Sequence, residues 1–174
     1  DGGTIFLQAG GSILDADPSG VSANPTQLQA SGIALEAGGN IGDASGSDPL
    51  EITAGTLAAT AAGADGIFVE GSGGSLTVDT VESPTDAQYS AVVQEVQSDG
   101  STVAINKTPL SDVRTTANNG AIDLRTPNGS LTINGGSDAS SSVGVSADGS
   151  GSVTLKATGG SGTRTLTVNA DVLS

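Results

Sequence analysis

The sequence predicts an all-β protein, a right-handed parallel β-helix (a solenoid) with three short strands per coil. Three observations favour this fold. A glycine-led phrase occurs five times, a second apolar phrase closely follows each copy, and a third apolar stretch precedes the next copy. Repetition at a period of tens of residues is typical of solenoids, because each repeat buries its apolar face against its neighbours.

The first phrase alternates aliphatic residues with other residues, which is the pattern of a strand. Its copies lie at residues 3–9, 32–37, 66–71, 120–126 and 151–157. Ten aliphatic residues are therefore expected to point inward and to stack in columns: Ile5, Leu7, Ile33, Leu35, Ile67, Val69, Ile122, Leu124, Val153 and Leu155. The outward column beside them contains Gln8, Glu36, Glu70, Arg125 and Lys156, and it predicts that Glu70 lies near Arg125.

The second phrase supplies another short strand after a corner. Its copies are residues 11–14, 39–42, 74–78, 129–133 and 163–168, and the third stretch is represented by 28–30, 50–54 with 57–59, and 143–147. Glycine and asparagine at the corners tolerate positive φ. Thr77, Thr132 and Thr167 recur in the second phrase. A flat threonine ladder would indicate ice binding, but β-propensity and stacking explain them more simply.

One domain is expected over residues 1–174, with an insertion at about 82–118. The glycines that open the first phrase are otherwise about thirty residues apart. Within the insertion, the β-rich runs 90–97 and 101–106 flank an Asp-Gly turn and predict a β-hairpin. The hairpin either stands off the coils or lies flat against one face, and Tyr89 lies at its entry.

Composition excludes several classes of protein. The net charge is −14 with only five basic residues, which argues against nucleic acid and against anionic membrane surfaces. No apolar run has the length of a membrane span, so no membrane insertion is expected. The chain begins at Asp1 rather than Met, and we expect a processed protein or a segment of a longer one.

Several stretches resemble a known family. Residues 66–71 with 74–78, and 119–125 with 128–133, are similar to the filamentous-haemagglutinin-like β-helix repeats of very large bacterial surface and secreted proteins. Residues 147–157 and 169–174 are also similar. The resemblance implies an extracellular or cell-surface location and a structural role in stalks, fibres and adhesins.

The residues needed for common catalytic centres are missing. The chain has no His and no Cys, so the usual nucleophile–base pairs and zinc sites are excluded, and we expect no enzyme. The alternative is a carbohydrate-binding or carbohydrate-cleaving β-helix, since Glu70, Asp123, Arg125 and Lys156 are expected on one outer face. A solvated strand face with ion pairs is the simpler interpretation, and we favour it.

Calcium is the one cofactor that the sequence suggests. Residues 15–20 match the opening of an Asp-x-Asp-x-Ser-Gly calcium loop, but Thr26 stands where the closing acid belongs. The candidate ligands are Asp15, Asp17, Asp43 and Asp48. Polar turns, in which Asp and Ser bind their own backbone, are the alternative.

The ends of the coil stack are the expected interface. Neither end carries an amphipathic helix, and an uncovered end is an unpaired edge with exposed apolar residues. We expect head-to-tail stacking on another copy, or on neighbouring repeats of a longer chain, with a surface polysaccharide as a further partner. Phe6 and Phe68 are expected to share one external apolar strip, covered by the insertion or by a partner. The candidate interface residues are Gly3, Ile5, Phe6, Phe68, Tyr89, Leu166, Val168 and Val172.

Overall fold

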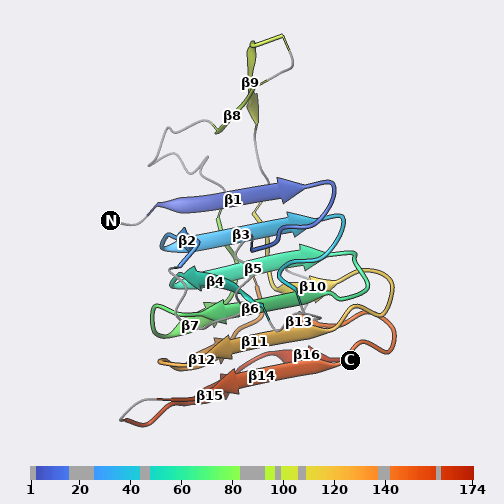
Figure 1. Cartoon of the computed structure of the whole chain (residues 1–174). Helices are drawn as coiled ribbons and strands as arrows, with labels where there is room; N and C mark the ends of the chain where they lie inside the picture. The colour runs from blue at the N-terminus through green and yellow to red at the C-terminus, as the bar shows by residue number, and fades with distance from the viewer. Residues whose placement is uncertain are drawn as a thin grey trace.

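The computed structural model consists of β-strands and contains no helix in the part of the chain that it describes. The described residues are 3–15, 26–43, 48–82, 93–96, 99–105, 109–136, 142–159 and 162–174. No helix capable of spanning a bilayer occurs among them. The strands lie above one another in a stack, with β1 near one end and β14 to β16 at the other (Figure 1).

The strands form two large sheets and one small one. The nine-stranded sheet contains β1 (Thr4–Ala9), β3 (Gly32–Ala37), β5 (Thr56–Ala61), β7 (Leu76–Val78), β10 (Val113–Thr115), β12 (Leu131–Ile133), β13 (Val143–Ser146), β15 (Leu166–Val168) and β16 (Asp171–Leu173). The five-stranded sheet contains β2 (Leu28–Gln29), β4 (Leu50–Thr53), β6 (Ile67–Gly71), β11 (Ile122–Thr126) and β14 (Val153–Ala157). The third sheet is the pair β8 (Val93–Val96) and β9 (Thr102–Ile105).

Neighbouring strands in the two large sheets run parallel and come from successive passes of the chain. Ile5 pairs with Ile33, and Ile33 pairs with Leu57. In the other sheet β6 pairs with β11 and β11 with β14, again in parallel. The prediction of an all-β chain with mostly parallel strands is confirmed. The two sheets are separate and do not close into one.

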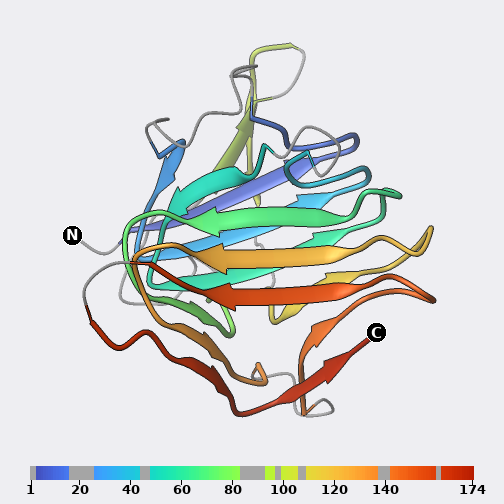
Figure 2. The same ribbon diagram turned by 60° about the horizontal axis from the view of Figure 1, so that its bottom comes forward.

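The larger and smaller sheets surround a common interior (Figure 2). Apolar side chains from both sheets form one core cluster there. Six of the ten residues predicted to point inward are buried, namely Ile33, Leu35, Ile67, Val69, Ile122 and Leu124. The other four, Ile5, Leu7, Val153 and Leu155, are partly buried and pack against the same cluster. These four belong to the first and last passes of the chain, where only one neighbouring strand covers them. The predicted inward register is therefore confirmed.

The sequence predicts that the five copies of the first phrase stack in one column. This prediction is wrong, because the copies are divided between the two sheets. The first two copies form β1 and β3 in the larger sheet, and the last three form β6, β11 and β14 in the smaller sheet. Strand β5 follows β3 instead, with Leu57 beside Ile33 and Ala59 beside Leu35. Strand β5 lacks the glycine-led phrase, but its apolar residues alternate along the strand in the same way. This alternation, not the phrase, allows β5 to bury its side chains beside β3.

Glycine and asparagine occupy the corners with positive φ, as predicted. Gly42, Gly66, Gly74, Gly149, Asn118 and Asn119 all have φ between 55° and 128°. At Gly66, a Cβ atom would collide with the backbone oxygen of Ala121 on the next pass. Glycine at this corner therefore allows two passes of the chain to approach each other closely.

The insertion leaves the larger sheet at a branch point. Strand β5 pairs along one edge with β3; along its other edge β7 pairs with its first half and β10 with its second half. The insertion connects β7 to β10. An antiparallel bridge joins Val81 to Leu110 at its base. The predicted range 82–118 thus includes β10, a strand of the sheet.

The predicted hairpin is confirmed, because β8 and β9 pair antiparallel within the insertion. Asp99 and Gly100 lie between the two strands, and Gly100 has a φ of 82°. In Figure 1 the hairpin stands apart from the stacked strands.

Candidate functional sites: two end faces and an acidic cluster

The last strands expose apolar side chains that continue the core columns. Leu166 and Val168 of β15 follow Leu131 and Ile133, and Val172 of β16 follows Val145. Their side chains are exposed by 42%, 50% and 36%, whereas their register partners on the previous pass, Leu131, Ile133 and Val145, are fully buried. Within the described residues no strand pairs with the outer edges of β14, β15 or β16. This end is therefore an apolar cross-section bordered by unpaired strand edges.

The first strand forms the opposite edge of the larger sheet. Strand β1 pairs only with β3 among the described strands, and Ile5 is partly buried. Gly3 is exposed, and its carbonyl accepts hydrogen bonds from the Ser31 amide at 2.9 Å and the Ser31 hydroxyl at 2.8 Å. Gly3 therefore fixes the start of β1 to the next pass.

Phe6 and Phe68 do not share an external strip. Phe6 pairs in register with Ala34 on the outer side of the larger sheet, whereas Phe68 belongs to β6 in the smaller sheet. The expectation of a shared face is wrong because the copies of the first phrase are divided between the two sheets. Val81 and Leu110, at the base of the insertion, pack on Phe6 and Ala34, so the insertion covers this part as one alternative predicted. Tyr89 lies outside the described residues.

Phe68 lies beneath a charged pair. The guanidinium carbon of Arg125 is 4.5 Å from the centroid of the Phe68 ring, and Phe68 is only 5% exposed. Arg125 donates two hydrogen bonds to Asp123, at 2.8 and 2.7 Å. Donation of these hydrogen bonds to the Asp123 carboxylate is the main reason that the pKa of Arg125 is raised. The three residues form a fixed group on the outer face of the smaller sheet.

The predicted outward column is also divided between the two sheets. In the larger sheet Gln8 pairs with Glu36, and Glu36 pairs with Thr60. In the smaller sheet Glu51, Glu70, Arg125 and Lys156 follow one another in register. Glu70 is thus the neighbour of Arg125, as predicted, although Arg125 forms its salt bridge with Asp123. Four residues considered for carbohydrate chemistry, Glu70, Asp123, Arg125 and Lys156, do lie on one outer face.

The second phrase forms polar ladders along the outer side of β7, β12 and β15. Thr77, Thr132 and Thr167 are register partners. Beside them, the Asn134 side-chain amide donates to Asp79 at 2.9 Å, and the Asn169 amide donates to Asn134 at 3.0 Å. Identical positions on successive passes therefore bind one another through their side chains.

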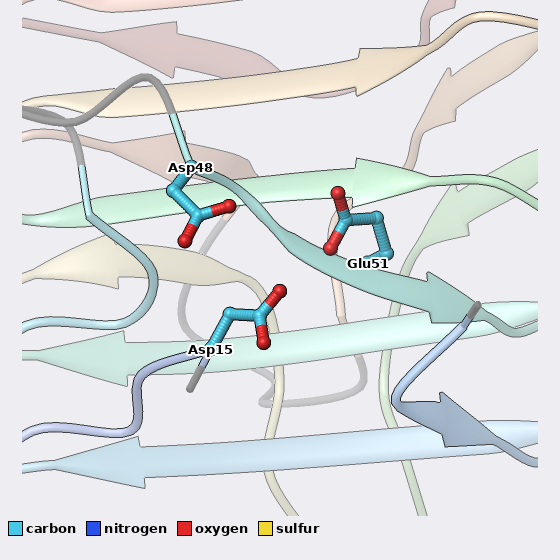
Figure 3. A group of neighbouring side chains, drawn as sticks. All are labelled: Asp15, Asp48 and Glu51. Atoms are coloured by element: carbon cyan, nitrogen blue, oxygen red, sulfur yellow. The ribbon is translucent and has the colours of Figure 1, made fainter. Parts of the chain in front are cut away.

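An acidic cluster joins two of the predicted calcium ligands to a third residue that the sequence analysis missed. Asp15, Asp48 and Glu51 each place a carboxylate oxygen within 4.8 Å of the other two (Figure 3). Asp43 shares a two-way backbone bridge with Asp48, at 2.9 and 3.1 Å, which holds these two residues side by side. Asp17 lies outside the described residues.

Glu51 is the buried member of this cluster. The residue is only 6% exposed, and its buried Oε2 atom has no hydrogen-bond partner among the described residues. Burial raises the pKa of the Glu51 carboxyl, and the negative charges of Asp15, Glu70 and Asp48 raise it further. Gln27 accepts a hydrogen bond from the Glu51 amide and donates one to Asp15, both at 3.0 Å. Gln27 therefore connects the first acidic corner to strand β4.

Comparison of the chain with protein-family models, with curated proteins and with solved structures found no match.

Proposed function

We propose that this chain is a segment of a right-handed parallel β-helix, similar to filamentous-haemagglutinin-like repeats, that acts as a structural unit of an extracellular fibre or adhesin stalk. Its ends join further coils, either of another copy or of a longer chain. The function is mechanical, since each pass of backbone pairs with the passes above and below at about 4.8 Å per step.

The apolar end face carries this proposal. Leu166, Val168 and Val172 continue columns that are fully buried one pass earlier. Covering them with another coil would remove apolar surface from water and would pair the free edges of β14, β15 and β16. Contact between one end and the opposite end of the next copy joins unlike surfaces, which gives an open filament rather than a closed ring.

The association of the 174-residue chain tests this proposal. We expect the molar mass measured by light scattering to rise with protein concentration, and filaments to appear in electron micrographs. Val168→Asp places a charge in the apolar column at a half-exposed position, so it should abolish association while the monomer stays folded.

The matched control is Ala64→Asp, which adds the same charge at an exposed corner between β5 and β6. This variant should associate like the unmodified chain. If coils of a longer chain normally cover the end face, the longer chain stays monomeric while the segment associates. A 174-residue chain that remains monomeric at high concentration would contradict the proposal.

The second candidate is a carbohydrate-binding or carbohydrate-cleaving protein. The observation that favours it is the outer face of the smaller sheet, where Glu70, Asp123, Arg125 and Lys156 lie together beside Phe68. Turnover or retention of acidic and neutral polysaccharides by the monomer would support this function. Unchanged binding in Arg125→Ala would argue against it.

A further inference from the structure

The three carboxylates of the acidic cluster come from two successive passes of the chain. Asp15 lies two residues after Ile13, which bridges to Ile41 on the next pass. Asp48 and Glu51 lie on that next pass, Asp48 two residues before β4 begins and Glu51 within β4. The side chains point toward a common space between them (Figure 3). A ligand in this space would touch both passes.

The spacing of the oxygens fits a calcium ion. Calcium binds carboxylate oxygens at 2.3–2.6 Å, so two ligands on opposite sides of the ion are about 5 Å apart. The three oxygens lie within 4.8 Å of one another. Magnesium prefers six ligands at about 2.1 Å in a strict octahedron and is reluctant to lose its waters. The cluster, with water completing the shell, therefore favours calcium over magnesium.

Glu51 supplies an independent observation. A carboxylate that is 94% buried normally has a partner, because an unpaired buried charge is costly. Within the part of the chain that the structure describes, Glu51 Oε2 has no hydrogen-bond partner, and the charges of Asp15, Glu70 and Asp48 act on this carboxyl. All three are negative, and Gln27 provides one neutral amide to the cluster, directed at Asp15. A divalent cation would neutralise this group and occupy the unused oxygen.

We propose that Asp15, Asp48 and Glu51 bind one calcium ion that fastens the first pass of the chain to the second. The ion is a structural ligand: it joins a corner of the first pass to strand β4, and it stabilises the folded state. The proposal does not rest on end-to-end assembly, because all three ligands belong to one chain. Three carboxylates completed by water are expected to give a dissociation constant of about 10⁻⁴–10⁻³ M, as in extracellular calcium modules.

Thermal unfolding and calorimetry of the whole chain test the site with calcium chloride as the probe. At pH 7 and 10 mM calcium, after removal of bound metal with a chelator, we expect the melting temperature to rise by about 3–10 °C. Magnesium at the same concentration should give less than half of this rise. Calorimetry should detect one calcium ion per chain.

Glu51→Gln keeps the shape of the side chain and removes its charge. In this variant the dissociation constant for calcium should increase at least tenfold and the calcium-dependent rise in melting temperature should disappear. Without calcium the variant should melt at or above the temperature of the unmodified protein, because an uncompensated buried charge is gone; this result also shows that it folds. Asp48→Asn should weaken calcium binding in the same way.

Glu70→Gln is the matched control, since Glu70 neighbours Glu51 in register but is not a member of the cluster. It should retain calcium binding within about threefold of the unmodified protein, since a neighbouring charge only modulates affinity. An unmodified protein that binds no calcium at 10 mM, or an equal calcium response in Glu51→Gln, would overturn the proposal.

Discussion

Leu124 shows how much a single core residue contributes in this narrow interior. Its side chain is fully buried between Val69 and Leu155 on the adjacent strands. We expect Leu124→Ala to lower the free energy of unfolding by about 2–5 kcal/mol, because β11 is paired with β6 on one side and β14 on the other, and these strands limit how far the site can collapse into the cavity. Urea unfolding followed by circular dichroism measures the loss.

Leu14 is the control for this prediction. It is 55% exposed, so Leu14→Ala should change the free energy of unfolding by less than about 0.5 kcal/mol. Similar losses for the two variants would show that position 124 is not tightly packed.

Glu51 gives a pH dependence whose sign follows from its raised pKa. In metal-free buffer the folded protein holds the Glu51 proton more tightly than the unfolded chain, whose ordinary value is 4.5. The stabilisation from that proton is complete below pH 4.5 and is lost as the pH rises through the higher folded value. The benefit of Glu51→Gln over the unmodified protein should therefore grow from pH 4 to pH 7.

Urea unfolding at pH 4, 5.5 and 7 measures the free energy of unfolding of Glu51→Gln and of the unmodified protein. Subtracting one from the other removes the contribution of groups that titrate alike in both. Asp15, Asp48 and Glu70 face Glu51 in both proteins. A difference that stays constant over this range would mean that Glu51 titrates normally.

At the scale of the element, the corner before β6 requires glycine. Gly66 has a φ of 86°, and a Cβ there would collide with the Ala121 backbone oxygen of the next pass. Gly66→Ala should cost at least about 2 kcal/mol, since left-handed strain of 1–2 kcal/mol adds to the collision. Gly10→Ala is the comparison, because nothing lies within 4 Å of a Cβ at that corner. Equal unfolding midpoints for both variants would contradict this account of the corner.

The asparagine ladder should stabilise the alignment of three strands. Asn134 donates to Asp79 and accepts from Asn169, so Asn134→Ala removes two hydrogen bonds on the outer face. We expect a loss of about 1–2 kcal/mol, measured by urea unfolding. Asn128→Ala, at an exposed turn before β12, should be nearly neutral. If Asn134→Ala leaves the free energy of unfolding unchanged, the side-chain hydrogen bonds do not stabilise the strand pairing.

Strand positions and side-chain direction could be predicted from the sequence, but stacking order could not. Alternation of apolar residues predicts which face of β3 or β11 is buried, because a shift by one residue would bury Glu36 or Arg125. Similarity between phrases does not determine which strands pair. Strand β5 follows β3 with Leu57, Ala59 and Ala61 inside, although its sequence lacks the phrase.

The acidic cluster was only partly predictable for a related reason. Asp15 and Asp48 are visible as acidic corners in the sequence. Glu51 lies in the middle of β4, where alternation predicts a side chain facing solvent. Its burial depends on neighbouring passes of the chain, which is tertiary information that no local pattern contains.

At the scale of the whole molecule, stability should vary along the stack. The middle passes have neighbours on both sides, whereas β15 and β16 expose Leu166, Val168 and Val172. Amide hydrogen exchange in dilute solution should therefore be faster in β15 and β16 than in β5 and β11. Under the assembly proposal, protection of β15 and β16 should increase with protein concentration. Uniform protection at all concentrations would show that the stack opens as one unit and that its last strands gain nothing from association.

The branch point at β5 has a consequence for what this architecture can carry. Two half-length strands, β7 and β10, continue one full strand, so the chain can leave between them while the backbone ladder remains complete on both sides. Val81 and Leu110 close the exit. Doubling the length of such an excursion costs only about 0.6 kcal/mol in loop-closure free energy. An insertion of another length or sequence could therefore leave the sheet at this position without interrupting the pairing of β5 with β3, β7 and β10.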